Sequence, residues 1–373
     1  MSFSVNIPVK IISGNECIKN NRNLFMLGKK AFIVTGRTSA KLSGALDDIT
    51  YVLGENKIGY EIFSEIIENP PIETCFKAGR LCAVSDCDFV IGIGGGSALD
   101  AAKAIAAYAV DDFATATDIF DAQNKKHASL PIIAVPTTAG TGSEANNYSI
   151  LTLPDGSRKK TFTHADSWAR YAFLDPKYTY TLPREYTFST ALDAFHHALE
   201  SYMSPKSNDF SEILAVYAAR NIWNVLSELP DIFTSEMRET LLYASCAAGL
   251  AISMTGTGFP HPLGYSLTLL DGIPHGKACA AFAGDYIEYN MKCVQGKERL
   301  LRFCSLIGTK EHALAALLTG IADVELSLDE DEIKKHIELI KNAKNYANSP
   351  YVISETEMYD IYRSHFGKSE SSK

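Results

Sequence analysis

The sequence lacks the features that mark a membrane protein or a nucleic-acid-binding protein. No apolar run reaches the roughly 18–20 residues that a membrane-spanning helix needs. Acidic residues outnumber basic ones, 44 to 35, and the net charge of −9 disfavours nucleic acid or an anionic membrane as the main partner. The opening stretch MSFSVNIPVKIISG has no basic region followed by a long apolar run. We therefore expect no signal peptide, no membrane or nucleic-acid partner, and a cytoplasmic location.

The cysteines lack the spacing of a redox pair or a zinc knuckle. None of the eight forms a C-x-x-C pair, and several stand in apolar or helical stretches, as Cys246 does in YASCAAGLA. The eight are Cys17, Cys75, Cys82, Cys87, Cys246, Cys279, Cys293 and Cys304. We expect buried, reduced thiols rather than a disulfide framework.

The chain is too long for one ordinary hydrophobic core. Its 373 residues favour two domains, and 46% apolar with 21% charged residues is typical of globular proteins. In the first half, short β-rich runs alternate with helical periodicity, which predicts a parallel sheet with crossover helices. The expected strands are 4–13 (at an edge, because of Pro8), 30–35, 60–63, 88–93, 131–136 and 172–174, and the expected helices are 39–54, 72–85 and 98–110.

The pattern changes towards the second half of the chain. Residues 148–153 and 158–162 predict two strands around an Asp155-Gly156 turn. Beyond residue 187 we expect only helices, over 188–203, 209–228, 235–253, 277–292, 297–306, 309–322 and 330–345. The sequence thus predicts an α/β domain over residues 1–180 and an all-α domain over 181–373.

One carboxylate and three histidines form a candidate metal-binding set. Asp193 and His197 stand four residues apart in ALDAFHHALE, so they share one face of a helix. His261 and His275 stand beside Pro and Gly turn signals, and together the four could bind a divalent transition metal, iron or zinc above all. Asp-x-x-x-His also arises by chance, and ordinary core histidines remain the alternative. His196 points about 100° away from His197 around the helix and is not expected to join the set.

Two loops after predicted buried strands are rich in glycine or hydroxyl groups. Residues 94–97, GGGS, join a strand to a helix N-terminus, where unpaired backbone N–H groups and the helix dipole favour an anion. Residues 136–144, PTTAGTGSE, hold four hydroxyls and two glycines. Taken alone, each loop could instead be a tight turn or a helix-capping turn that binds no ligand. Because parallel strands end at one edge of a sheet, we interpret the pair as the site of a phosphate-bearing cofactor.

Four stretches together carry the pattern of a known family. They are GGGSALDAAKAIA (94–106), PTTAGTGSEANN (136–147), LDAFHHALESYMS (192–204) and HPLGYSLTLLDGIPHGKACA (261–280). The chain resembles the iron-containing alcohol dehydrogenase family, which includes butanol and propanediol dehydrogenases. The resemblance implies a Rossmann-like α/β domain that binds NAD or NADP and a helical metal-binding domain, in a dehydroquinate-synthase-like architecture. It also implies metal-dependent hydride transfer between the cofactor and a small primary alcohol or aldehyde.

The resemblance further implies the roles of particular residues. The metal ligands, for Fe²⁺ or Zn²⁺, fall on Asp193, His197, His261 and His275. The residues expected to receive the pyrophosphate, line the cofactor cleft, or lie near the ribose or nicotinamide are Gly95, Gly96, Ser97 and Asp100, then Thr137, Thr138, Thr141 and Ser143, then Asn69, Lys160 and Leu182.

Two departures from the family pattern bear on function. Tyr265 stands where many members carry a further histidine near the nicotinamide, so it is the one candidate for handling a proton. Its ordinary pKa of about 10 makes it a weak base, and packing is the alternative role. After the first long strand, many NAD-using members have an Asp that binds the ribose. Here Gly36 is followed by Arg37, Ser39 and Lys41, which suit a 2′-phosphate, so we expect NADP to be favoured. The alternative is an exposed, solvated helix start.

Other functions remain open from the sequence. One is a polyol dehydrogenase of the glycerol type or a dehydroquinate-synthase-like lyase, and another is a non-enzymatic metal- or nucleotide-binding protein. Residues 144–150 and 251–276 contain almost no Lys or Arg, which favours a small neutral substrate over a phosphorylated one. A homodimer is the default expectation.

Overall fold

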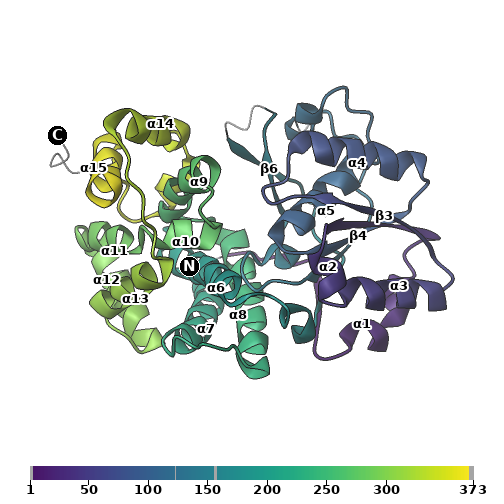
Figure 1. Ribbon diagram of the computed structural model, residues 1–373, viewed down its shortest axis with the longest axis horizontal. Coiled ribbons are helices and arrows are strands. Elements are labelled where there is room, and N and C mark those ends of the chain that lie inside the picture. The colour runs from purple at the N-terminus through teal and green to yellow at the C-terminus, as the bar shows by residue number, and fades with distance from the viewer. Residues whose placement is uncertain (1–2, 122, 155–157, 369–373) are drawn as a thin grey trace. The chain divides into compact units, whose positions relative to one another are not determined.

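Contacts divide the chain into two compact units. The computed structural model describes residues 3–121, 123–154 and 158–368 (Figure 1). One unit, called here the α/β unit, consists of Ser4–Arg184 and Asp231–Gly249. The other, the helical unit, consists of Glu185–Pro230 and the chain from Leu250 onward. The predicted domain boundary near residue 180 stays a prediction.

A six-stranded parallel sheet forms the centre of the α/β unit. Its order is β1-β8-β5-β4-β2-β3. The bounds are β1 Lys10–Ser13, β2 Lys30–Gly36, β3 Gly59–Ile66, β4 Phe89–Gly94, β5 Ile132–Pro136 and β8 Tyr171–Leu174. Every residue of β4 and β5 is buried, because these continuous apolar runs lie inside a sheet that is covered on both faces. The predicted parallel sheet is confirmed. The edge strand expected over 4–13 is present only over 10–13, because residues 4–9, with Pro8, form no strand.

Helices cover both faces of this sheet. Helices α4 and α5 lie on one face and α1 to α3 on the other (Figure 1). The bounds are α1 Cys17–Asn20, α2 Ser39–Leu42, α3 Ala45–Glu55, α4 Ile72–Val84 and α5 Gly96–Tyr108, with short 3₁₀ helices η1 Arg22–Phe25, η2 Ala116–Phe120, η3 Ser143–Ala145 and η4 Pro176–Thr179. Small residues bring α5 close to the sheet, since a Cβ added at Gly92 would lie 2.8 Å from Cβ of Ala102.

Two local predictions for this unit need comment. The single helix expected over 39–54 is wrong: Gly44 has a left-handed φ of 79° and separates α2 from α3. The antiparallel pair is confirmed as β6 Tyr148–Thr152 and β7 Lys159–Thr163. The predicted Asp155-Gly156 turn between them lies outside the described residues.

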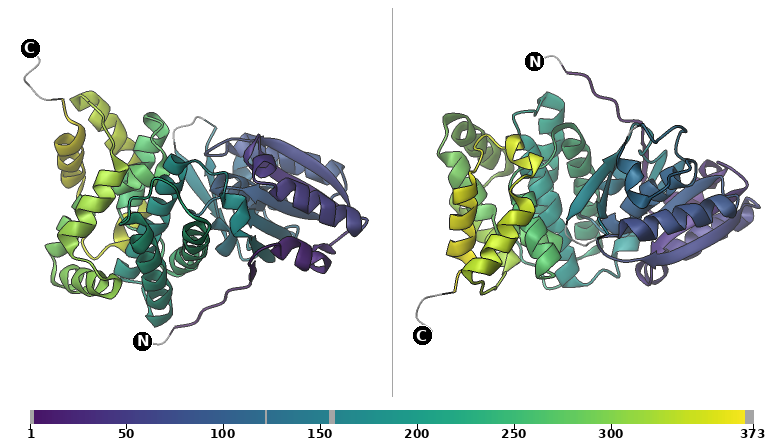
Figure 2. Two further views of the ribbon diagram at one scale, coloured as in Figure 1. Left: turned by 60° about the horizontal axis from the view of Figure 1, so that its bottom comes forward. Right: turned by 90° about the horizontal axis from the view of Figure 1, so that it is seen from above.

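The helical unit contains no strand among the residues that the structure describes (Figure 2). Its helices are α6 Arg184–Met203, α7 Asp209–Leu226, the end of α8 Ser235–Thr255, α9 Pro260–Leu270, α10 His275–Ala280, α11 Ala283–Met291, α12 Val294–Ile307, α13 Glu311–Ala322, α14 Glu330–Ile340 and α15 Glu355–Phe366, with the 3₁₀ helix η5 Lys344–Asn348. No single helix of the described residues is long and apolar enough to cross a membrane. Helices α8 and α9 reach that length and apolar composition only as a pair, and the pair is bent by 112°.

Four helices of this unit differ from the prediction. The predicted helix 277–292 is two helices, and the first, α10, already begins at His275. Helices α9 and α15 had not been predicted at all. Helix α9 carries Pro260 and Pro262, which read as turn signals but lie in its first turn, where the missing N–H groups have no intrahelical partner. His261 and His275 therefore lie on helices rather than in turns.

The close approach of Gly142 and Gly249 yields a stability prediction. A Cβ at Gly249, inside α8, would lie 2.4 Å from the carbonyl oxygen of Gly142. We expect Gly249→Ala to lower the free energy of unfolding by about 1–3 kcal/mol, the usual range for overpacking. Urea unfolding measures it. The control Gly320→Ala, in α13 with open space around it, should stabilise the protein or leave it unchanged. Equal effects of the two changes would contradict the packing argument.

Candidate active site

Helix α6 carries the first two residues of the predicted metal set. Asp193 and His197 lie one turn apart, and their side chains are 5% and 8% exposed. Oδ1 of Asp193 is 3.5 Å from Nε2 of His197. The predicted pairing on one helix face is what the structure shows.

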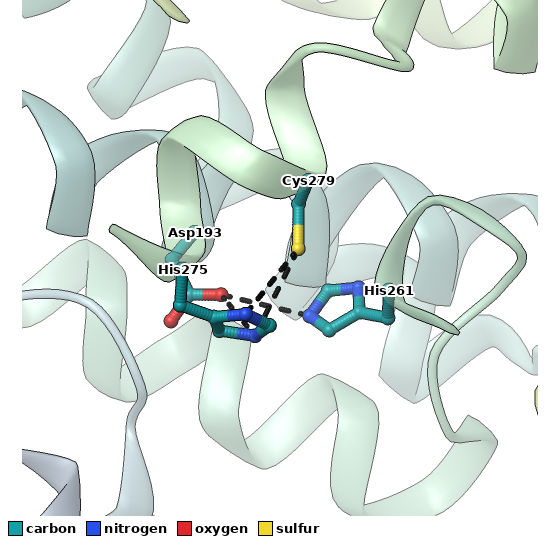
Figure 3. Close-up of side chains that lie close together, drawn as sticks. All are labelled: Asp193, His261, His275 and Cys279. Carbon is teal, nitrogen blue, oxygen red and sulfur yellow. Dashed lines mark hydrogen bonds and ion pairs between the residues drawn. The ribbon is translucent and has the colours of Figure 1, made fainter. Parts of the chain in front are cut away.

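The other two histidines approach the same carboxylate oxygen from α9 and α10. Oδ1 of Asp193 is 3.5 Å from Nε2 of His261 and 3.8 Å from Nε2 of His275 (Figure 3). The rings of His197 and His261 are stacked, with centroids 4.8 Å apart. Three imidazole nitrogens from three helices thus converge on one oxygen.

Glycine at position 276 makes this convergence possible. A Cβ there would lie 1.7 Å from the carbonyl oxygen of Ser189 and 2.9 Å from the backbone nitrogen of Asp193. The first turn of α10 therefore rests directly on the backbone of α6. This contact places His275 beside Asp193.

The convergence leaves polar atoms unsatisfied. Oδ1 of Asp193 and Nε2 of His261 are both buried, and neither has a hydrogen-bond partner among the described residues. A buried polar group without a hydrogen bond costs about 1–3 kcal/mol. The ion pair between the two atoms, at 3.5 Å, offsets part of this cost. A divalent cation bound among them would satisfy both atoms, and carboxylate oxygen with imidazole nitrogen is a donor set that iron and zinc accept. The residues present fit a metal ion.

Glu200, which the sequence reasoning missed, supports His261 from behind. Its Oε2 accepts the N–H of Gly258 at 2.6 Å and lies 2.8 Å from Nδ1 of His261. Its Oε1 lies 3.1 Å from Nδ1 of His196. His196 therefore contacts Glu200, away from the converging atoms. The four-residue spacing of His196 and Glu200 on α6 was the available signal.

The charges of this cluster shift its pKa values. Burial acts to raise the pKa of Glu200, but His261 and His196 outweigh it and lower the pKa to about 2. Burial likewise acts to raise the pKa of Asp193, and His197, His261 and His275 lower it below the usual range. Burial acts to lower the pKa of His261, whereas Glu200 and Asp193 raise it to about 9. Both carboxylates are thus held ionised, ready to attract a cation.

Two further side chains border the cluster. Tyr265 stacks on the ring of His275, with centroids 5.4 Å apart, and meets His261 edge-on at 6.3 Å. Cys279 places Sγ 3.8 Å from both ring nitrogens of His275 (Figure 3). Cys279 was expected to be an ordinary buried thiol. Since α10 already begins at His275, the two residues share this helix.

The glycine turn and the hydroxyl-rich loop touch in the α/β unit. Gly95 caps the N-terminus of α5 without a side chain. A Cβ at Gly95 would lie 3.2 Å from Cγ2 of Thr138, and one at Gly96 would lie 2.5 Å from Cγ2 of Thr141. The threonines therefore lie against the turn, at the end of α5 where a helix can offer its first N–H groups to a ligand.

Neighbouring segments extend this surface. The N–H of Asn69 donates to Oγ of Ser97 at 3.2 Å, and the N–H of Thr137 donates to the carbonyl of Gly94 at 2.9 Å. Oγ1 of Thr137 is buried without a hydrogen-bond partner among the described residues. The structure thus brings the predicted residues Asn69 and Thr137 to the glycine turn.

Gly36 and Ser39 lie beside the same turn. Oγ of Ser39 is 3.9 Å from the position of a Cβ at either Gly36 or Gly94. Strands β2 and β4 are neighbours in the sheet, which explains why their ends meet. Arg37 and Lys41 are exposed.

Asp100 and Ser143 form a buried brace beneath the loop. Oδ1 of Asp100 accepts the hydroxyl of Ser143 at 2.5 Å, and Oδ2 accepts the N–H of Ile150 at 2.9 Å. Nζ of Lys103 donates to Ser143 at 2.7 Å and to the carbonyl of Tyr148 at 2.6 Å. Burial lowers the pKa of Lys103 to about 8. The polar atoms of Asp100 and Ser143 thus contact protein.

Lys160 and Leu182 have other surroundings. Nζ of Lys160 lies 4.2 Å above the ring of Phe120, at a pocket of about 160 Å³ next to β7. The N–H of Leu182 donates to the carbonyl of Thr179, and its own carbonyl accepts from Arg238 at 2.9 Å. No described contact links either residue with the glycine turn.

Comparison with known proteins places this arrangement in a family. Residues 8–176 match the family model described as iron-containing alcohol dehydrogenase, and residues 187–366 match the C-terminal model of the same family. The chain is 28% identical to the NADPH-dependent butanol dehydrogenase of Clostridium saccharobutylicum, over 95% of this chain and 96% of that one. It is 29% identical to the NADH-dependent butanol dehydrogenase A of Clostridium acetobutylicum, over 94% and 87%.

A solved structure agrees with the sequence comparison. The iron-containing alcohol dehydrogenase of Thermotoga maritima is 36% identical, with a TM-score of 0.90 over 98% of this chain and 99% of that one. The chain belongs to the iron-containing alcohol dehydrogenase family. It is accordingly an oxidoreductase that acts on alcohols, as the resemblance in the sequence had implied.

The position of Glu200 yields a prediction. We expect Glu200→Gln to weaken metal binding by about 10–100-fold, because a neutral amide no longer holds Nδ1–H of His261 with a full charge. Metal titration measures the affinity. The exposed Glu338→Gln serves as the control and should leave it unchanged. An unaltered affinity in Glu200→Gln would show that the carboxylate does not support the site.

Proposed function

We propose that Asp193, His197, His261 and His275 bind one divalent metal ion, Fe²⁺ or Zn²⁺. The observation that carries the proposal is the convergence of three imidazole nitrogens within 3.8 Å of a single buried carboxylate oxygen. The protein then interconverts small primary alcohols and aldehydes with NADP(H) or NAD(H). The chain resembles two butanol dehydrogenases over most of its length, which supports this substrate class.

The chain's own residues prepare the site for this chemistry. When bound, the ion acts as a Lewis acid that lowers the pKa of an alcohol. Glu200 holds His261 in place, so that its Nε2 faces Asp193. The ring of Tyr265 covers one face of His275 and keeps water from that side. Its contact with two imidazole rings favours a packing role for Tyr265 over that of a base.

For the cofactor, we propose the surface formed by the glycine turn and its neighbours. The N-terminus of α5 receives the pyrophosphate at Gly95, Gly96 and Ser97. The side of the turn next to Ser39 receives the ribose. Exposed Arg37 and Lys41 suit a 2′-phosphate, so NADP is preferred. One butanol dehydrogenase relative is NADPH-dependent and another NADH-dependent, so the preference rests on these residues.

Several features of the proposal come from the sequence. Residues 144–150 and 251–276 are almost free of Lys and Arg, which supports a small neutral substrate. The division of roles between residues 1–180, for the cofactor, and 181–373, for the metal, stays a prediction. A homodimer and a cytoplasmic location likewise stay predictions.

Removal of His261 tests the metal site. We expect His261→Ala to lose bound metal and to lower alcohol oxidation by more than about 100-fold. The reason is that removing a ligand lowers metal affinity and activity more than removing a residue that only supports a ligand. Metal analysis and a panel of alcohols and aldehydes, assayed with both cofactors after loading with Fe²⁺ or Zn²⁺, provide the two readouts. Exposed His312→Ala is the control. Full metal content with full activity in His261→Ala would refute the assignment.

Replacement of Arg37 tests the cofactor preference. The wild type should show a higher kcat/KM with NADPH than with NADH. We expect Arg37→Ala to lower the NADPH value by about 10–100-fold and the NADH value little, since a hydrogen bond to a charged group contributes about 1.5–3 kcal/mol. Exposed Lys334→Ala, on α14 of the helical unit, is the control. A wild-type preference for NADH would contradict the proposal.

A further inference from the structure

A cysteine stands where a further metal ligand would. Cys279 follows His275 by four residues on α10, so the two side chains share one helix face. Asp193 and His197 have the same spacing on α6. Sγ of Cys279 is 3.8 Å from both ring nitrogens of His275, and the residue is fully buried. Two helices thus present matching pairs of donor side chains to one place.

The distances suit coordination of one ion. One donor atom from each of Asp193, His261, His275 and Cys279 can be chosen so that all four lie within 4.8 Å of one another. Zinc bonds of about 2.0–2.1 Å to nitrogen and about 2.3 Å to sulfur place tetrahedral ligands about 3.3–3.8 Å apart. Donor separations of up to 4.8 Å have to shorten by about 1 Å for Cys279 to reach an ion held by the other donors. With His197, which the proposed site also includes, Cys279 is then a fifth ligand.

The packing around Cys279 holds the thiol at this position. A Cβ at Gly264 in α9 would lie 2.8 Å from the backbone nitrogen of Cys279 and 3.0 Å from its Sγ. Backbone of α9 therefore touches the start of the cysteine side chain, and only glycine leaves room for the sulfur. The contact keeps α9, which carries His261, against α10, which carries His275 and Cys279.

We propose that Cys279 is a metal-binding residue of this protein. This inference rests on the proposed metal site. On binding, the thiol releases its proton to solvent, and the thiolate Sγ forms a bond to the ion. The donor set then contains sulfur besides carboxylate oxygen and imidazole nitrogen. Such a set selects borderline or soft divalent ions, such as zinc, cobalt and cadmium, over hard ions such as manganese.

Cobalt substitution tests the sulfur bond directly. In the full-length protein loaded with Co²⁺, visible ligand-field bands report binding at the site, and a near-ultraviolet sulfur-to-cobalt charge-transfer band reports a thiolate ligand. We expect both in the wild type. Cys279→Ser should lose the charge-transfer band and keep visible bands, whereas the control Cys304→Ala, a buried thiol of α12, should keep both.

The outcomes separate this inference from the proposed function. Visible bands in the wild type without a charge-transfer band would overturn the role of Cys279 and leave the metal site intact. Absence of bound cobalt would overturn both. The wild-type spectrum alone gives this answer, so it does not depend on the folding of any variant.

Metal selectivity provides a second readout. We expect Cys279→Ser to weaken Cd²⁺ binding by about tenfold or more, on the scale of changes at a metal site, and to alter Mn²⁺ binding by much less. Competition titration with each ion measures both affinities. Equal losses for Cd²⁺ and Mn²⁺ would show that Cys279 acts through packing against Gly264 and His275, and would overturn the proposal.

Discussion

A buried carboxylate is the constraint on which the helical unit depends. Asp193 sits inside α6, and an ionised group there must be compensated by nearby cationic or metal partners. Three histidines from three helices supply that compensation at one oxygen. The glycine that follows His275 serves this arrangement, because it lets the backbone of α10 approach the backbone of α6 beside Asp193. Glu200, two turns further along α6, is a second buried carboxylate, and it contacts the other ring nitrogen of His261.

The α/β unit also contains buried charged side chains, and there they hold a loop in place. Asp100 and Lys103 are buried, and their hydrogen bonds hold the hydroxyl-rich loop and the start of β6. Because these side chains are satisfied within the protein, the loop is held firmly beside the glycine turn. The surface above them consists of backbone N–H groups and hydroxyls. In this way, buried charged side chains in both units hold the groups of the proposed metal and cofactor sites in position.

Much of the fold and part of the site followed from local sequence. Strands such as β4 were predictable because parallel strands covered on both faces are continuous apolar runs. Asp193 and His197 were predictable as a pair because helical spacing is local. Helix α9 was missed because two prolines in its first turn resemble a turn, and the break at Gly44 was missed because glycine tolerates helix and left-handed turn alike. Both failures concern residues whose local preference is compatible with two structures.

The sequence by itself determined the alternation of parallel strands and helices in the first half of the chain, the helical character of the second half, the family, and the residue types able to bind a metal and a nucleotide. Only the tertiary structure decided which groups meet. The contact of Glu200 with His261 could not be predicted, because His261 comes from another helix far along the chain. Cys279 was not paired with His275, because α10 begins two residues before the predicted helix and so includes His275. Tertiary packing likewise set Asp100 and Ser143 beneath the loop rather than on its surface. Spacing along one helix is fixed by its geometry, whereas contacts between helices depend on how closely their backbones can approach.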